Sequence, residues 1–348
     1  MKFFAALAMA AMAVAAPTEK RAPTPLDVKL ELVGNSEVKA TVTNNGKNNL
    51  KLFSTGTFLD DAPVEKVSVL SGDKPVSFDG VKLLVATENL EEDAFTRLDS
   101  GESLEVTFDI AEYHDLSAGG AFKISSEGAF SFAEADSTEL VGSVPFTANT
   151  VEAEVDGASA AAIHTAFVNE KRTRVQSDCS GTRLSQTRSG LSGCASWAAQ
   201  AQSVAQSGSA TKMNEYFKSS TSTTRSTVAG VFSRIRSECS STSSGVSTFY
   251  CTDFYGVCGG GVIAYTVPSL SAMAYCPLHF SLPVGPTSCY GNNQIGTVLH
   301  EVTHLRQIAG TEDFGGYGYN FVRSLSSSQN LRHADTYTLF AQSINRGC

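Results

Sequence analysis

The sequence predicts two unlike domains: an all-β sandwich of immunoglobulin-like type, then a mainly helical α+β domain with a small β-sheet and disulfide bonds. Three observations predict this division. Apolar and polar residues alternate from Pro25 to about Phe146, and all eight cysteines follow Arg172. Residues 1–172 carry 14 basic and 27 acidic side chains (net −13), whereas residues 173–348 carry 12 and 8 (net +4). A chain of 348 residues, 42% of them hydrophobic, is long enough to bury two cores.

Composition also excludes two classes of protein. The net charge of −9 is unlike that of a basic nucleic-acid-binding protein. Beyond the N-terminus no run of about 18 apolar residues occurs, so a membrane-spanning segment is not expected. We therefore expect neither a nucleic acid nor a membrane as partner.

The N-terminus has the features of a secretory signal peptide. Met1-Lys2 precedes an apolar stretch that runs to Ala16 and ends in the small-residue pattern Ala13-Val14-Ala15. We assign residues 1–16 to the signal and expect an extracellular protein. In that oxidising environment the even number of cysteines predicts a disulfide framework, although eight cysteines allow about 105 pairings.

The pair Lys171-Arg172 lies where cysteine usage and the sign of the charge both change. This coincidence predicts cleavage by a protease specific for paired basic residues. Residues 17–172 would then be a propeptide, which makes the chain a zymogen. The mature domain, residues 173–348, would keep 176 of the 348 residues, an ordinary size for one domain.

In the first half, period-two alternation predicts short strands separated by turns. An Asn-Asn-Gly-Lys-Asn hairpin turn at 44–48 is typical of such a fold. Many short strands at regular spacing favour a sandwich. The alternation stops after 150, and Ala158–Ala162 indicate a helix or an exposed linker before the cleavage pair. The expected strands are 26–32, 38–42, 50–53, 67–69, 81–85 and 104–108.

The second half changes to helical periodicity. Helices are expected around 194–201, 213–218 and 227–236, and strands at 262–265 and 273–276. One apolar stripe, Ile295, Val298, Leu299, Val302 and Leu305, predicts a helix that Gly310 would end. A last helix is expected from Leu331 to about Ile344.

The sequence His300-Glu301-Val302-Thr303-His304 lies inside the predicted helix with the apolar stripe. Residues four apart share a helix face, so both imidazoles can bind one metal ion. Glu301 lies beside them on a neighbouring face, where a general base would act. This His-Glu-x-x-His pattern predicts a zinc peptidase.

A catalytic zinc needs a third protein ligand. After His304 the spacing of a third histidine ligand is absent, and the candidates are Glu312, Asp313, His333, Asp335 and the C-terminal carboxylate. Glu312 and Asp313 follow the helix in a turn, whereas His333 and Asp335 belong to the last predicted helix. Because a helix is the more rigid support, Asp335 is favoured.

With these residues the whole chain resembles the deuterolysin family of fungal zinc endopeptidases, the aspzincins. The resemblance rests on residues 300–304, on Gly310-Thr311-Glu312-Asp313-Phe314-Gly315-Gly316-Tyr317-Gly318 and on Ala334-Asp335-Thr336-Tyr337. It implies a zincin-like catalytic domain that binds one zinc ion through His300, His304 and Asp335. It also implies that Glu301 is the general base and that proteins, basic ones such as histones and protamines included, are the substrates.

The resemblance further implies three disulfides, Cys179–Cys251, Cys258–Cys276 and Cys289–Cys348, which leaves Cys194–Cys239 as an additional pair. The segment between Gly310-Thr311 and Tyr317-Gly318 has five residues where the family usually has four, so roles in substrate or transition-state binding transfer less directly to Asp313 and Tyr317. Where the family tends to have a tyrosine after the cysteine, this chain has Leu278-His279-Phe280, and His279 becomes a candidate hydrogen-bond donor.

Opposite charges on the two halves predict long-range attraction between them. We therefore expect the propeptide to assist folding and to inhibit the enzyme. Two alternatives remain at this point. One is a secreted adhesion or carbohydrate-binding protein with a non-catalytic metal site. The other is a metallopeptidase of a different clan that uses Glu312 or Asp313 as the third ligand.

Overall fold

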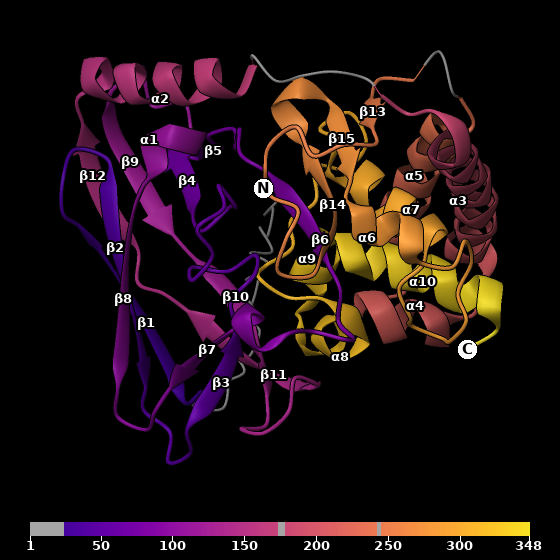
Figure 1. Cartoon of the computed structure of the whole chain (residues 1–348), viewed down its shortest axis with the longest axis horizontal. Helices are drawn as coiled ribbons and strands as arrows, with labels where there is room; N and C mark the ends of the chain where they lie inside the picture. The colour runs from indigo at the N-terminus through magenta and orange to yellow at the C-terminus, as the bar shows by residue number, and fades with distance from the viewer. Residues whose placement is uncertain (1–23, 173–177, 242–244) are drawn as a thin grey trace, which may run out of the picture.

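The computed structural model describes residues 24–172, 178–241 and 245–348. A β-rich N-terminal half (24–172) packs beside a mainly helical C-terminal half (178–348) (Figure 1). The expected signal peptide, 1–16, and the residues just after Arg172 lie outside the described residues. Among the described helices, none is long and apolar enough to cross a membrane.

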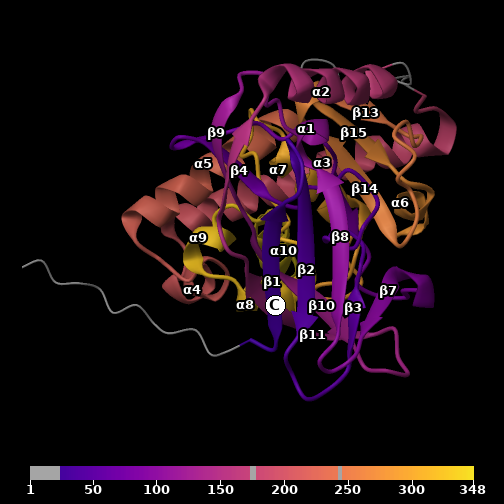
Figure 2. The ribbon, with the colours of Figure 1, turned by 90° about the vertical axis from the view of Figure 1, so that its left-hand side faces the viewer.

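The N-terminal half consists of antiparallel strands around one apolar core. Strand β1 (Leu26–Leu32) pairs with β2 (Glu37–Asn44), which pairs with β8 (Ser103–Asp109), and side chains along β1 and β2 alternate between buried and more exposed positions. Figure 2 shows this sheet facing the viewer, in front of the helices of the other half. A second sheet has the order β11-β10-β3-β7 and a third has the order β12-β9-β4-β5. Their strands are β3 (Leu50–Phe53), β4 (Ser68–Ser71), β5 (Lys74–Pro75), β7 (Phe95–Leu98), β9 (Gly120–Ser125), β10 (Glu127–Ala133), β11 (Leu140–Thr147) and β12 (Val151–Val155).

Strands β1, β2, β3, β4 and β8 agree with expected segments, whereas β5, β7 and β9 to β12 were not predicted individually. The architecture also differs from the expected sandwich. Among the described residues the strands of this half form three small sheets of their own, whereas two were expected. Two short helices, η1 (Glu92–Ala94) and α1 (Ile110–Tyr113), and the longer α2 (Gly157–Arg172) complete the described part of this half. Helix α2 occupies the segment for which a helix or a linker was expected, and it ends at the basic pair.

The C-terminal half is built on two long helices, α3 (Gly181–Ser207) and α5 (Ser222–Cys239), which pack against each other. Both are longer than the sequence predicted. Helix α7 (Gln294–His304) buries the predicted apolar stripe between them and a small sheet. Helix α10 (Ala334–Arg346) packs on α7 and α3. The remaining helices are α4 (Ala210–Phe217), η2 (Pro268–Leu270), α6 (Pro277–Ser281), α8 (Gly318–Ser324) and α9 (Ser327–Asn330).

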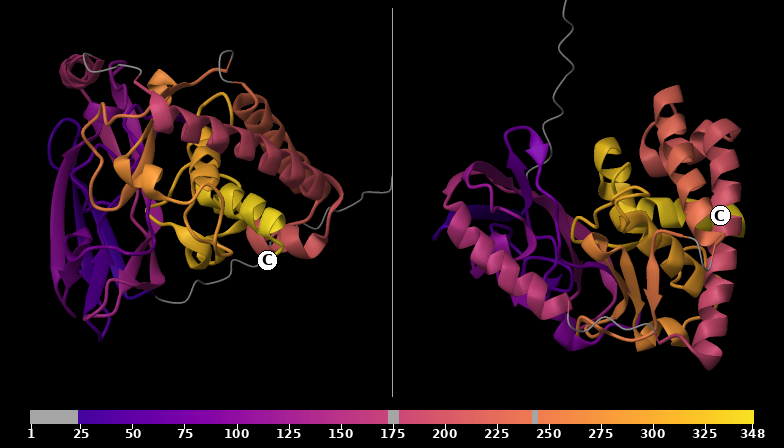
Figure 3. Two further views of the ribbon diagram at one scale, coloured as in Figure 1. Left: turned by 45° about the vertical axis from the view of Figure 1, so that its right-hand side comes forward. Right: turned by 90° about the horizontal axis from the view of Figure 1, so that it is seen from above.

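The sheet of this half contains one strand from the other half. Strands β13 (Thr248–Tyr250), β15 (Ala272–Tyr275) and β14 (Val262–Val267) belong to the C-terminal half, and β6 (Lys82–Val85) adds to the free edge of β14. Seen from above, these strands lie between the other strands of the N-terminal half and the helices of the C-terminal half (Figure 3). Sequence alternation predicted β6 as a strand, but not this partner.

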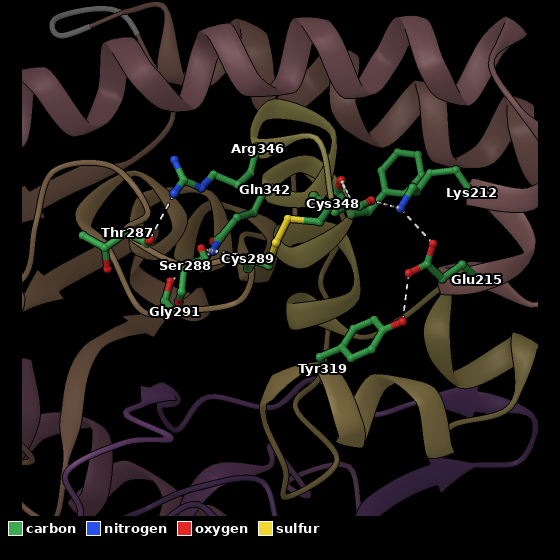
Figure 4. The surroundings of a disulfide bond; sticks show 12 residues. Lys212, Glu215, Thr287, Ser288, Cys289, Gly291, Tyr319, Gln342, Arg346 and Cys348 are labelled. Atoms are coloured by element: carbon green, nitrogen blue, oxygen red, sulfur yellow. Dashed lines mark hydrogen bonds and ion pairs between the residues drawn. A yellow bond between two sulfur atoms is a disulfide. The ribbon is translucent and has the colours of Figure 1, made fainter.

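Four disulfides link the C-terminal half, and they are the same four pairs as expected: Cys179–Cys251, Cys194–Cys239, Cys258–Cys276 and Cys289–Cys348. The last one ties the end of α10 to the loop before α7. Around it, Lys212 Nζ donates to the main-chain oxygen of Cys348 at 2.8 Å, and Gln342 Nε2 donates to the Gly291 carbonyl at 3.1 Å (Figure 4). Helix α10 is therefore held at its C-terminal end by one covalent bond and several hydrogen bonds.

Candidate active site

Helix α7 carries the two histidines and the glutamate of the motif. The helix begins at the cap residue Asn293, whose side chain accepts a hydrogen bond from Gly296 N at 2.8 Å. His300, Glu301 and His304 lie in its last two turns and are at most 1% exposed. The apolar stripe turns this helix into the core, so the polar side chains on its other positions are buried as well.

The imidazoles of His300 and His304 converge on one carboxylate. Asp313 Oδ1 lies 3.3 Å from His300 Nε2 and 3.5 Å from His304 Nε2. Among the described residues none of these three buried atoms has a hydrogen-bond partner. Unpartnered buried polar atoms are costly unless something binds them. Two neutral imidazole nitrogens and a carboxylate oxygen within 4.8 Å of one another form a set that fits a zinc ion.

The other nitrogen of each ring is occupied. His300 Nδ1 lies 2.9 Å from Asp335 Oδ1, and His304 Nδ1 lies 3.0 Å from the Thr311 carbonyl oxygen. A ring that donates from Nδ1 presents an unprotonated Nε2. Asp335 and Thr311 therefore orient the two histidines, as the hydrogen-bond partners of metal ligands commonly do.

The structure places Asp335 differently from the expectation that it is the third ligand. Its Oδ1 faces the far side of the His300 ring, and its Oδ2 accepts a hydrogen bond from Gly318 N at 2.6 Å. Asp335 lies in the first turn of α10, behind His300 rather than in front of it. Asp313, which the sequence left open as a less favoured third ligand and as a candidate for substrate binding, is the carboxylate brought to both Nε2 atoms.

The loop that carries Asp313 is held in place by backbone hydrogen bonds. Because a helix was expected to be the more rigid support, this rigidity of the loop was not predicted. Thr311 N donates to the Thr303 carbonyl on α7 at 3.2 Å. Glu312 N donates to the Arg332 carbonyl at 2.7 Å, and Ala334 N donates back to the Glu312 carbonyl at 3.1 Å. The loop is thus tied to both helices.

Glu301 lies apart from the three converging atoms, next to the sheet. Its Oε2 accepts a hydrogen bond from Thr266 Oγ1 on β14 at 2.6 Å, and its Oε1 has no partner among the described residues. Burial raises the pKa of Glu301 to about 8, although the nearby His300 and the Thr266 hydrogen bond oppose the shift. A buried carboxylate with one free oxygen and a raised pKa suits proton transfer near neutral pH.

Burial and neighbouring carboxylates set the pKa values of the histidines. For His304, burial lowers the pKa to about 3, so the ring is neutral. For His300, burial also acts to lower the pKa, but the carboxylates of Asp313 and Asp335 raise it well above its usual value. The pKa of Asp313 falls to about 2 against the effect of burial, because both histidines stabilise its charged form. The two carboxylates that favour a positive charge on His300 would equally favour a bound cation beside it.

The structure brings Tyr317 to the site but not His279. The Tyr317 ring lies 6.3 Å from the His300 ring, centroid to centroid, and burial raises its pKa well above the usual value, so the hydroxyl stays protonated. His279 stacks on Tyr275 at 4.2 Å. Burial lowers its pKa to about 3, and among the described residues neither ring nitrogen has a hydrogen-bond partner.

Two residues that orient side chains of the site, Thr266 and Thr311, were not predicted from the sequence. Thr266, on β14, precedes the motif by 35 residues and orients Glu301. Thr311 orients His304 through its carbonyl, which any residue type offers. Only its place in the Gly310–Gly318 segment pointed to it.

Comparisons with known proteins identify the family of the chain. Residues 2–348 match the model of the deuterolysin metalloprotease family. A neutral protease 2 homolog of Colletotrichum graminicola is 55% identical over 98% of this chain and 97% of its own length. A neutral protease 2 homolog of Phaeosphaeria nodorum is 54% identical over 99% of this chain and 98% of its own length. A zinc peptidase from Grifola frondosa is similar in structure over 47% of this chain and 97% of its own, with a TM-score of 0.41 and 24% identity.

Proposed function

Because the chain belongs to the deuterolysin metalloprotease family and is therefore a zinc metalloendopeptidase, we propose that residues 173–348 are its secreted catalytic domain. Residues 17–172 are then a prosegment, removed after Lys171-Arg172 by a protease specific for paired basic residues. The signal-like residues 1–16, the change of charge at the junction and the restriction of the cysteines to residues 179–348 support this division.

His300, His304 and Asp313 hold the zinc ion in this proposal. The observation that carries it is the convergence of three buried, otherwise unpartnered atoms, the two Nε2 atoms and Asp313 Oδ1. Asp335 positions His300 and strengthens it as a ligand through the Nδ1 hydrogen bond. When bound, zinc supplies a Lewis acid that polarises the scissile carbonyl and activates water for attack.

Glu301 is the general base. Its free Oε1 accepts the proton of the attacking water, and Thr266 holds the other oxygen so that the carboxylate keeps one orientation. The same carboxyl group then returns the proton to the leaving amine. Tyr317 keeps its hydroxyl proton, so it donates a hydrogen bond where negative charge develops on the carbonyl oxygen.

Basic proteins are the proposed substrate class. The catalytic domain has a net charge of +4, but only eight of its residues are acidic. Four of those eight lie at the site: Glu301, Glu312, Asp313 and Asp335. The acidic side chains at the active site attract basic segments of a substrate, whereas the rest of the positively charged domain does not.

Hydrolysis of casein by the processed enzyme tests the proposal. We expect activity to disappear with a metal chelator, to persist with a non-chelating isomer of that chelator, and to return when zinc is added back. Proteolysis that survives complete removal of metal, verified by elemental analysis, would contradict it.

A further inference from the structure

The edge of β14 carries a strand from the proposed prosegment. Strand β6 runs antiparallel to β14, with Val85 opposite Val262, Leu84 opposite Ala264, Leu83 opposite Tyr265 and Lys82 opposite Thr266. The pairing continues past the strand, where Ala86 N donates to the Gly261 carbonyl at 2.8 Å. Without β6, β14 would be an edge strand with a row of unpaired backbone groups, which an extended peptide can pair with.

This edge leads directly to the catalytic glutamate. Thr266, opposite Lys82, donates its hydroxyl to Glu301 Oε2 at 2.6 Å. A chain segment paired with β14 therefore passes next to Glu301. Gly56, in the connection between β3 and β4, lies close to the Tyr317 hydroxyl. A Cβ atom added to this glycine would lie 2.9 Å from the hydroxyl oxygen. The prosegment is thus adjacent to the site at two points. One is Thr266, which orients the proposed general base Glu301, and the other is Tyr317, the proposed hydrogen-bond donor.

The cavity beside Asp313, where the two halves meet, is small. A cavity of about 170 Å³ lies beside Asp313 and Tyr317, and prosegment residues Glu65 and Lys82 line its other side. Ligand sites usually measure about 300–1,000 Å³. With β6 in place, this cavity beside Asp313 is therefore smaller than a peptide substrate needs.

The contact between β6 and the C-terminal half does not depend on the covalent connection. All four residues of β6 are buried, and Leu83, Leu84 and Val85 belong to the same apolar core as helix α7. Arg306 Nη2 binds the Phe78 carbonyl and Asp79 Oδ1, each at 2.7 Å. On the far side of the site, Ala129 N donates to the Phe314 carbonyl at 3.2 Å.

We propose that β6 occupies the position on β14 that an extended substrate segment takes, and that it stays there after the chain is cut behind Arg172. Latency then ends when the prosegment dissociates or is degraded, not at the cut itself. The inference rests on the proposed function, because it assumes that the site described above hydrolyses peptides.

The location of the junction supports the second part of this proposal. Helix α2, which ends at Arg172, lies at the upper rim of the N-terminal half, whereas β6 and β14 lie in the middle of the molecule (Figure 1). Cutting after Arg172 removes none of the contacts made by β6, Arg306 or Phe314.

The chemistry of the occupant agrees with the proposed substrate class. Lys82 is buried and forms an ion pair with Glu65. Burial lowers its pKa, but the charges of Glu65, Glu312 and Asp313 raise it above the usual value overall, so the ammonium stays charged. Glu312 and Asp313 remain in the mature enzyme, where they are available to a basic side chain in place of Lys82.

The experiment uses the full precursor cut by a protease specific for paired basic residues. Size-exclusion chromatography of the cut sample, hydrogen exchange at residues 262–267 and casein hydrolysis are measured together. We expect the two pieces to elute together, the β14 amides to stay protected, and activity to stay below one tenth of its final value until the prosegment is lost. Full activity with the prosegment still bound, or β14 amides that exchange equally in the presence and absence of the prosegment, would overturn the proposal.

A matched pair of prosegment variants separates release of β6 from general instability. Leu84→Ala shortens a side chain at the β14 edge, and Leu52→Ala shortens a buried leucine in the separate N-terminal core. We expect Leu84→Ala to speed dissociation of the cut prosegment at least tenfold, and Leu52→Ala to speed it less than threefold under conditions where both prosegments remain folded by circular dichroism. Equal effects would contradict a specific role of β6.

The elution and exchange measurements do not depend on zinc or on hydrolysis. If the proposed function failed, casein would remain intact while the β14 amides still became exposed on loss of the prosegment. If the inference alone failed, the cut complex would hydrolyse casein at once. The two failures are therefore distinguishable.

Discussion

The two halves of the chain are stabilised in different ways. The N-terminal half contains no cysteine and relies on one apolar core of its own, whereas the C-terminal half has four disulfides that close loops of 18 to 72 residues. Part of the N-terminal half, β6 above all, belongs to the core of the C-terminal half. One half is cross-linked by covalent bonds, and the other is held by non-covalent contacts.

The halves also differ in where their charges act. The first half carries 27 acidic side chains against 14 basic ones, whereas the second half has only eight acidic side chains, and four of these lie at one site. The comparison teaches that the chemistry and the covalent bonds are confined to the same half, so changes in each half should have separable consequences.

The largest effect is expected from Glu301→Gln in the catalytic half. The amide cannot accept the proton, so kcat/KM should fall by about 10²- to 10⁴-fold, the usual contribution of a general base. Zinc content and the thermal midpoint should stay close to those of the unchanged enzyme, because the side chain keeps its shape. Kinetics on a peptide substrate and elemental analysis measure both. Near-normal turnover would show that another group carries the proton.

A second pair of variants compares the two aspartates. Asp313→Ala removes a proposed ligand, so the purified protein should contain little zinc. Asp335→Asn removes only the charge behind His300, and loss of such a partner typically weakens metal binding by about 10- to 100-fold. Zinc titration against a competing chelator gives both values. If Asp335→Asn lost zinc more completely than Asp313→Ala, the assignment of the third ligand would have to be reversed.

A third prediction concerns the covalent bonds of the catalytic half. Replacing Cys289 and Cys348 by serine removes a disulfide that closes a 59-residue separation and anchors α10. The mature enzyme should lose about 2–5 kcal/mol of unfolding free energy, measured by denaturant unfolding. Mild reducing agent should likewise destabilise the C-terminal half while the N-terminal half, which has no cysteine, unfolds at an unchanged denaturant concentration.

The smallest effect is a pH dependence in the N-terminal half. Burial lowers the pKa of Lys66 to about 8, against which nearby carboxylates act only weakly. Between about pH 8 and 9.5 the unfolded chain therefore binds more protons than the folded one, so the unfolding free energy rises with pH, by at most about 1.4 kcal/mol per pH unit. Denaturant unfolding of the precursor across this window measures the slope. Lys66→Met should abolish the slope, and a slope that survives this substitution would assign it to other groups.

Much of the site followed from local sequence. The period of the apolar stripe and the spacing of His300 and His304 are properties of one helix, and α7 has both. The strands of the N-terminal half followed from alternation in the same way. Helix α3 is much longer than predicted. Its turns are rich in small residues and have no apolar stripe, and they are stabilised by packing on α5.

What local sequence did not reveal are contacts between distant segments. Asp313 and Asp335 are both acidic residues after the motif, and contacts between distant segments, such as the bridge between Glu312 and His333 and the Gly318 hydrogen bond to Asp335, place Asp313 at the two Nε2 atoms. Strand β6 has a short, mostly apolar sequence, and nothing in it indicates that its partner lies about 180 residues further along the chain. Such pairings depend on tertiary packing, which overrides local preference.

The most direct test of the account is the zinc coordination itself. Anomalous diffraction at the zinc edge, from crystals of the processed enzyme, identifies the metal and the atoms bound to it. The account predicts zinc bonded to His300 Nε2, His304 Nε2 and a carboxylate oxygen of Asp313, with Asp335 on the opposite side of the His300 ring. Zinc bonded to Asp335, or bound away from the two histidines, would contradict it.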